Sequence, residues 1–264
     1  MHPEWKRICK EYLQATSYTP SGWEEHWNGR NYDPQNRPET YLTYPDAEVI
    51  LPLGKPKFPK KNTNIWDVFK NRRSKRNFTD TPMTLEELNI LLWSSMGITA
   101  DLGSYQLRTA PSSGALYPIE TYLCIHNVEG IPEGIYHLNV KDWSLEGIKL
   151  SDFRDQAHRT LLEQTMTQKA AVNVIWTAVL ERCESKYHER AYRYIWWDSG
   201  MVGENFLLAA TGLDLGACLM GAWFDDLAHE LLEIDGISHF SVLTASVGKV
   251  IGDNWLEDRR PPQS

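Results

Sequence analysis

The chain has 264 residues, of which 42% are hydrophobic and 23% charged, and its formal net charge at pH 7 is −8. This length allows a sizeable core, and the composition is typical of a soluble globular protein. The acidic balance argues against a general nucleic-acid-binding protein, because such proteins carry a basic footprint. No apolar run approaches the roughly 18 residues of a membrane-spanning helix, and residues 1–14 lack the apolar segment of a signal peptide.

The four cysteines are far apart in the chain and form no CxxC pair. We therefore expect neither a metal site nor a disulfide framework. The dispersed histidines give no metal-ligand spacing either. A reducing cytoplasm is the simplest location for a chain of this kind.

Residues 1–62 are rich in Trp, Tyr, Pro and Asn, unlike the rest of the chain. A short helix is expected over 4–16, and the prolines from residue 34 onward exclude a long helix after residue 30. The segment holds too many aromatic residues for a disordered tail. We expect an ordered arm over 1–62 that packs on a main domain over 63–264.

From residue 64 the pattern becomes regular. Residues 65–73 predict a helix with Ile65, Val68 and Phe69 on its apolar face. Thr84 with Glu87 three residues later is a capping box, and it predicts a helix that ends at Gly97. The β-rich residues 119–128 predict a strand, and residues 134–150 predict a hairpin.

The second half of the chain adds further helices and strands. Residues 150–166 predict one polar helix, and the apolar run 171–180 predicts a central strand buried on both faces. A long helix is expected over 189–212, where Gly200 and Gly203 indicate close packing against it. A helix over 225–236 and a strand over 239–250 follow. Because helices and strands do not alternate strictly, we expect an α+β fold with helices around a largely antiparallel sheet.

Residues 71–78, NRRSKRNF, are the first stretch that can carry chemistry. They place Arg72, Arg73, Ser74 and Arg76 directly after an amphipathic helix. The planar guanidinium presents a fork of donors that suits phosphate. The alternative is a solvated basic turn.

Two later stretches can hold a flat polar ligand. In residues 108–120, RTAPSSGALYPIE, two hydroxyls and a glycine precede an apolar strand, and such a loop can bond a heteroaromatic ring edge or a ribityl chain. In residues 211–226, glycines at 212, 216 and 221 would let the backbone approach a ligand closely. The alternatives are a surface turn for the first, and a helix C-cap followed by a strand for the second.

Taken in this order, the three stretches and the SVGKV near the C-terminal end resemble the nitroreductase superfamily of flavin enzymes. The likeness is strongest to its SagB-type branch, the azoline oxidases, and it covers about residues 65–262. The Trp- and Tyr-rich arm is also similar to the leading region of that branch. The resemblance implies an α+β homodimer that binds FMN non-covalently at the subunit interface.

The resemblance also assigns roles to matching positions. The implied cofactor-binding residues are Arg72, Arg73, Ser74, Arg76, Pro111, Ser112, Ser113, Gly114, Asn205, Gly221, Ala222, Arg259 and Arg260. The arginines and Ser74 correspond to phosphate and ribityl ligands, the loop over 111–114 to the isoalloxazine and ribityl side, and the backbone N–H of Gly221 and Ala222 to flavin N5. Lys186 and Tyr187 correspond to a catalytic pair.

The long helix departs from the family pattern. Related proteins often carry Gly-His and Gln-Asn there, whereas this chain has Gly200-Met201 and Glu204-Asn205. Methionine in place of histidine removes a proton carrier, so the departure bears on the chemistry more than on FMN binding.

Two functions from different classes stay open on the sequence alone. The first is an FMN-dependent oxidoreductase that moves hydride or electrons between a donor and a small-molecule or peptide-derived substrate. NADH or NADPH is one candidate donor, and dehydrogenation of an azoline ring with oxygen as acceptor is the other route. The second is a non-catalytic flavin-binding or scaffold subunit of a peptide-modifying complex, with the arm as docking surface. A flavin-modifying or dehalogenating enzyme is a third option.

Overall fold

The computed structural model describes residues 3–18, 20, 33, 37–59, 64–103 and 105–251. Its strands are β1 (Val49–Pro52), β2 (Ile98–Asp101), β3 (Gln106–Arg108), β4 (Ile119–Ile125), β5 (Gly134–Asn139), β6 (Ser144–Lys149), β7 (Val172–Val179), β8 (Gly216–Met220) and β9 (His239–Gly248). Its α-helices are α1 (Pro3–Ala15), α3 (Ile65–Asn71), α4 (Leu85–Met96), α5 (Arg154–Thr160), α6 (Thr165–Lys169), α7 (Leu180–Tyr187), α8 (Ala191–Gly212) and α9 (Asp225–Leu232), with the short 3₁₀ turns η1 (Ser113–Ala115) and η2 (His188–Arg190).

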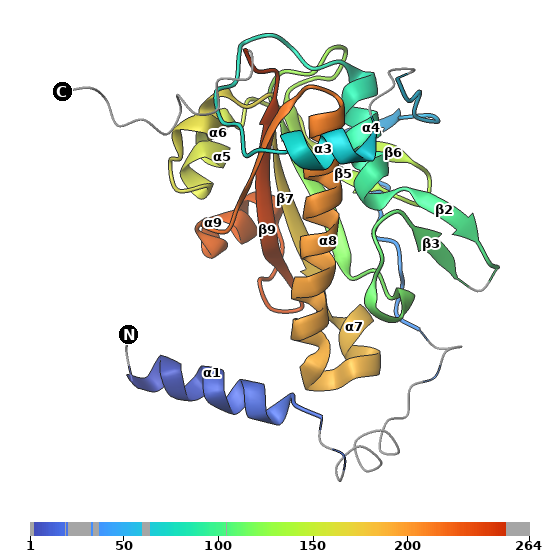
Figure 1. Cartoon of the computed structure of the whole chain (residues 1–264), viewed down its shortest axis with the longest axis vertical. Coiled ribbons are helices and arrows are strands. Elements are labelled where there is room, and N and C mark those ends of the chain that lie inside the picture. The colour runs from blue at the N-terminus through green and yellow to red at the C-terminus, as the bar shows by residue number, and fades with distance from the viewer. Residues whose placement is uncertain are drawn as a thin grey trace.

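Seven strands form one sheet in the order β1-β6-β5-β4-β7-β9-β8, and every neighbouring pair in it is antiparallel. Strands β2 and β3 form a separate hairpin. Helices lie against this sheet, with the long α8 running along it (Figure 1). The expected α+β class with a mostly antiparallel sheet flanked by helices is confirmed.

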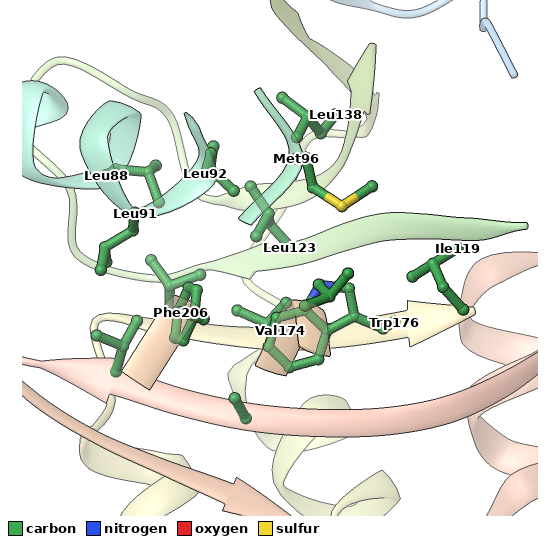
Figure 2. Close-up of a cluster of buried hydrophobic side chains, with 14 of the residues drawn as sticks. Leu88, Leu91, Leu92, Met96, Ile119, Leu123, Leu138, Val174, Trp176 and Phe206 are labelled. Atoms are coloured by element: carbon green, nitrogen blue, oxygen red, sulfur yellow. The ribbon is translucent and has the colours of Figure 1, made fainter. Parts of the chain in front are cut away.

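The predicted central strand is β7. It pairs with β4 along one edge and with β9 along the other, and all its residues except Val179 are buried. Side chains from α4, β4, β7 and α8 meet beside it in the main apolar core (Figure 2). The rings of Trp176 and Phe206 pack edge to face there, with centroids 5.4 Å apart. A continuous apolar run therefore does predict a strand that is covered on both faces.

Local sequence signals predicted the ends of α4 and a position of close packing on α8. Thr84 and Glu87 form the reciprocal capping box, and Gly97 is the C-cap of α4. A Cβ at Gly203 would lie 2.7 Å from Leu243 Cδ2, so close packing at this glycine is confirmed. Within one chain nothing packs closely at Gly200, where a Cβ would meet nothing within 4 Å.

Two other sequence predictions need correction. The polar helix expected over 150–166 is two short helices, α5 and α6, because Leu162 and Glu163 between them adopt left-handed φ values of 58° and 51°. On α3 only Val68 of the expected apolar face is buried, whereas Ile65 and Phe69 are about half exposed. Val68 is thus the one buried residue of α3, and the rest of its apolar face is exposed to solvent.

Residues 37–59 of the predicted arm run along the main domain. Arg37 donates to the Ala115 carbonyl at 2.8 Å, and β1 pairs with β6 at the sheet edge. Arg193 of α8 donates from Nε to Thr16 Oγ1 at 2.7 Å and from Nη2 to the Leu13 carbonyl at 2.9 Å. Part of the arm lies outside the described residues, so the domain boundary at residue 62 stays a prediction.

Two buried histidines predict acid destabilisation. Burial lowers the pKa of both His126 and His239 to about 4. The unfolded chain therefore binds protons near pH 6.5 that the folded chain binds only near pH 4. Unfolding free energy should fall as the pH drops through this window, by at most about 1.4 kcal/mol per pH unit for each histidine.

Denaturant unfolding at pH 7, 6 and 5 measures this slope. His137 contributes to the pH dependence of stability with the opposite sign, because its hydrogen bonds to carboxylates outweigh its burial and raise its pKa. Its contribution is complete below pH 6.5 and is lost at higher pH, so it opposes the fall in stability between pH 7 and 6 and leaves the slope between pH 6 and 5 unchanged. A His239→Gln variant should show a shallower slope, and an unfolding free energy that stays flat down to pH 5 would contradict the prediction.

Candidate functional site

The loop before β4 is fastened to α8 by a buried carboxylate. Asp198 is 2% exposed and accepts from the Ser112 hydroxyl at 2.6 Å and from the Ser113 hydroxyl at 3.1 Å. The Ser113 backbone N–H lies 3.1 and 3.2 Å from its two oxygens. Ser112 Oγ also accepts from the Tyr117 N–H at 2.9 Å. The expected ligand loop is therefore held from within by its own chain.

The same loop touches the predicted catalytic pair. Gly114 has φ 66°, and a Cβ there would lie 2.7 Å from Tyr187 Oη and 3.0 Å from Lys186 Nζ. Glycine is required twice, by the left-handed backbone and by this close approach. The structure thus brings together residues that the sequence places more than 70 positions apart.

Gly114→Ala should be more destabilising than a glycine-to-alanine change at a matched turn. Gly130 has φ 76° with nothing within 4 Å of a Cβ, so Gly130→Ala carries the left-handed penalty of about 1–2 kcal/mol alone. Gly114→Ala carries that penalty and also displaces Lys186 and Tyr187, which should add about 1 kcal/mol. Thermal or denaturant unfolding of the two variants compares them, and equal losses would contradict the contact.

Tyr187 can hold a proton at this position. Burial and its tyrosine and acidic neighbours raise its pKa to about 12, so the hydroxyl stays protonated at neutral pH. Its ring packs on Tyr194 with centroids 4.4 Å apart, and Lys186 Nζ lies 5.5 Å from the Tyr187 ring centroid. The pair lies at the end of α7, where it meets the loop (Figure 1).

A line of buried charges holds α7 to the sheet. Arg182 Nη1 donates to Glu120 Oε1 at 2.5 Å, and Glu120 Oε2 lies 3.0 Å from His137 Nε2. His137 Nδ1 lies 2.9 Å from Glu146 on the next strand. Burial alone would raise the pKa of Glu120, but Arg182 and His137 outweigh it and lower that pKa to about 2. Arg182, Glu120, His137 and Glu146 thus form one chain of contacts across α7, β4, β5 and β6.

The arginine-rich stretch lies at the other end of α8. Ser74 forms a bridge with Ala217 of β8, and the Lys75 N–H donates to the Ala217 carbonyl at 3.1 Å. Arg72 and Arg76 are half-buried, and Arg76 Nη1 donates to the Ser74 carbonyl at 3.2 Å. Extended backbone paired to β8 therefore presents these guanidinium groups at the surface.

Within one chain, the two predicted sets of FMN ligands, the arginine stretch and the serine loop, do not come together. The arginine stretch follows α3, which lies across the Gly212 end of α8, whereas the serine loop is bonded to Asp198 near the opposite end (Figure 1). Gly212 follows Asp198 by 14 positions on α8, which corresponds to about 20 Å of helix. A single flavin-sized ligand cannot contact both ends within one chain unless it lies along that length.

Other predicted ligands have separate positions. Asn205 donates from Nδ2 to the Ser94 carbonyl of α4 at 3.1 Å, so part of its amide ties α8 to α4. Gly221 is exposed, and a Cβ there would meet nothing within 4 Å, so its backbone is open to a ligand. Ala222 accepts from Gln164 Nε2 at 3.2 Å. Arg259 and Arg260 lie outside the described residues.

Large apolar side chains are exposed on α3, which precedes the arginine stretch, and on α8, which is bonded to the serine loop. On α3, Trp66 is 74% and Phe69 51% exposed, and on α8 Trp196, Trp197 and Met201 are exposed. Monomeric proteins rarely leave such patches uncovered. Met201 and the exposed Glu204, the two departures noted in the sequence, both lie on the outward side of α8.

Two important residues were not predicted from the sequence. Asp198 holds the serine loop, and Arg182 holds α7 through Glu120 and the carbonyls of Tyr117 and Glu39. A lone acid within the aromatic run YIWWDSG was the available signal for Asp198, because a buried acid in a helix needs donors.

The described residues contain no group of three or more His, Cys, Asp and Glu side chains placed to hold a metal ion. No helix in the described part of the chain has the length and apolar character needed to cross a membrane. None of the four cysteines forms a disulfide bond in the described structure.

Comparisons with known proteins point to one family. The Nitroreductase family model matches residues 69–249. The chain is 33% identical to MJ1384 of Methanocaldococcus jannaschii, a protein named for the nitroreductases, over 185 residues that cover 70% of this chain and 90% of that protein. It is 26% identical to the microcin B17-processing protein McbC of Escherichia coli over 180 residues, covering 66% of this chain and 64% of McbC.

Solved structures share the fold. A nitroreductase-type structure from Anabaena variabilis matches 80% of this chain with a TM-score of 0.68 and 26% identity, and the match spans 44% of that longer chain. A nitroreductase-type structure from Desulfovibrio desulfuricans, solved in complex with FMN, matches 76% of this chain and 94% of that chain with a TM-score of 0.52 and 18% identity.

Proposed function

Because the chain belongs to the nitroreductase family, we propose that it is an FMN-dependent oxidoreductase whose cofactor lies between two copies of the chain. The observation that carries the proposal is that the arginine stretch and the serine loop lie toward opposite ends of α8 in one chain. Arg72 to Arg76 of one copy would meet the loop of Pro111, Ser112, Ser113 and Gly114 from the second copy. The exposed aromatic residues of α3 and α8 would be covered in the same contact.

The residues present fit FMN. Guanidinium groups bind phosphate through charge-assisted hydrogen bonds, and Arg72, Arg73 and Arg76 are clustered on a chain whose net charge is negative. Gly221 leaves space for a flat ring to approach its backbone. An FMN-bound structure with this fold supports the same cofactor. Arg259 and Arg260 stay proposed as further phosphate ligands.

When bound, FMN supplies hydride and electron transfer, and the chain binds and orients it. The backbone of Gly221 and Ala222 would stabilise negative charge on the ring. Tyr187 would hold a proton at Oη beside the loop, with Lys186 adding positive charge next to it. These are the residues that we propose to act on the substrate.

The substrate that we propose is a small molecule or a peptide-derived group. Similarity to McbC, which is named as a microcin-processing protein, favours the peptide-derived class. NADH or NADPH is the proposed electron donor if the reaction is a reduction. We propose a cytoplasmic location, because disulfide bonds are rare in that compartment and the cysteines here form none.

The visible absorption spectrum of the purified protein, followed by anaerobic addition of NADPH or NADH, tests the function. We expect an oxidised-flavin spectrum, and bleaching by either nucleotide would assign a reductase. A flavin spectrum that does not bleach would assign substrate dehydrogenation instead. A colourless protein that takes up no added FMN would overturn the proposal.

A non-catalytic subunit of a peptide-modifying complex is the second candidate. The exposed Met201, where related proteins often carry histidine, favours it. Flavin binding without turnover by any donor or substrate, together with a stable complex with a peptide-modifying partner, would support this candidate over the oxidoreductase.

A further inference from the structure

The hydroxyl groups of the serine loop do not face outward. Ser112 Oγ and Ser113 Oγ both donate to the buried Asp198, and the Ser113 N–H donates to it as well. Ser112 Oγ in turn accepts from the Tyr117 N–H. Each of these groups already has an intrachain partner, so the part of the loop that remains to meet a ligand is its backbone around Gly114.

The hydrogen-bond donors around Asp198 favour its ionised form. Three donors converge on its two oxygens, and one of them is a backbone N–H that cannot accept a hydrogen bond. Such an arrangement matches an ionised carboxylate, which only accepts. Burial raises the pKa of Asp198 above its ordinary value, and the hydrogen bonds from Ser112 and Ser113 offset part of this effect. The loop and the carboxylate therefore stabilise one another.

Asp198 further connects the loop to the candidate catalytic pair. It anchors Ser113, and the next residue, Gly114, lies against Lys186 and Tyr187. Arg108, whose buried Nε has no hydrogen-bond partner among the described residues, lines the same small cavity of about 10 Å³ as Asp198 and Ser112. A guanidinium and a carboxylate thus face one cavity behind the loop.

We infer that Asp198 is a positioning residue, which presets the loop over 112–114 so that its backbone, rather than its serine hydroxyls, meets the flavin. The inference rests on the proposed function for the identity of the ligand. The serine hydroxyls act through Asp198, and they contribute to FMN affinity only by holding the loop in this conformation.

A double-mutant cycle on FMN dissociation constants tests this inference. Asp198→Asn should weaken FMN binding about tenfold, since it replaces an acceptor with a donor facing donors. Ser113→Ala should weaken it by a similar factor, and the double variant should be no weaker than the worse single variant. Ser199→Ala removes a neighbouring α8 hydroxyl that donates to the Trp196 carbonyl, and it should leave the affinity unchanged.

Additive effects of Asp198→Asn and Ser113→Ala would overturn the inference, because they would show that the hydroxyl contacts the flavin directly. Amide hydrogen exchange of the cofactor-free protein gives a readout that does not depend on FMN. The Ser113 amide should be protected in the wild type and exchange at least about tenfold faster in Asp198→Asn. An unprotected wild-type amide would overturn the inference even if FMN binds, whereas a protected amide in a protein that binds no FMN would overturn only the proposed function.

Discussion

An Arg72→Ala and Arg76→Ala double variant should bind FMN at least about a hundredfold more weakly than the wild type. Each guanidinium would lose charge-assisted bonds to phosphate, which are worth about 1.5–3 kcal/mol apiece. Both side chains are half-buried at the surface, so the variant should remain folded. Titration of FMN fluorescence with cofactor-free protein measures the dissociation constants.

The matched control is Arg159→Ala. Arg159 is an exposed arginine of α5, so its removal changes net charge without touching the candidate site. Its FMN affinity should equal that of the wild type. If Arg159→Ala weakened FMN binding as much as Arg72→Ala alone or Arg76→Ala alone, the effect would be one of general charge, and this would contradict the assigned phosphate site.

Replacing Arg182 with methionine should cost about 3–5 kcal/mol of unfolding free energy. The change leaves Glu120 as a buried carboxylate that has lost its guanidinium partner, and removing one partner of a buried ion pair has an effect of this size. It also removes the donors to the Tyr117 and Glu39 carbonyls. Urea unfolding at pH 7 measures the loss.

The double variant Arg182→Met with Glu120→Gln separates the charge from the packing. It should recover part of the stability, because no unpaired carboxylate is then buried. The wild type should also lose stability below pH 4.5 as Glu120 is protonated with a pKa of about 2, since a depressed carboxylate pKa stabilises the fold only above that range. A loss below about 1 kcal/mol in Arg182→Met would contradict a buried, structurally required ion pair.

The sequence predicted those features of the fold that depend on local chemistry. The capping box at Thr84 and the apolar run over 171–180 each determine an element by themselves. The break between α5 and α6 was missed because left-handed Leu162 and Glu163 carry no glycine or proline signal. Tertiary packing set those conformations, and one sequence does not reveal it.

The candidate site likewise contains features that the sequence predicted and features that depend on tertiary contacts. A motif resemblance located the arginine stretch and the serine loop, but it could not show that one chain keeps them at opposite ends of α8. Asp198 and Arg182 were missed because their partners, Ser113 and Glu120, lie more than 60 positions away. The open face of Ile65 and Phe69 on α3 matched an ordinary core-facing pattern in the sequence, since periodicity does not distinguish a core from an interface.

Subunit complementation tests the shared site most directly. One parent carries Arg72→Ala with Arg76→Ala, and the other carries Gly114→Val, whose side chain would collide with Tyr187 in a left-handed backbone. Neither parent homodimer should retain FMN. A mixed dimer, isolated through two different affinity tags, joins intact arginines from one chain to an intact loop from the other. We expect one FMN bound per mixed dimer, and a mixed dimer without FMN would contradict a cofactor site built from both copies.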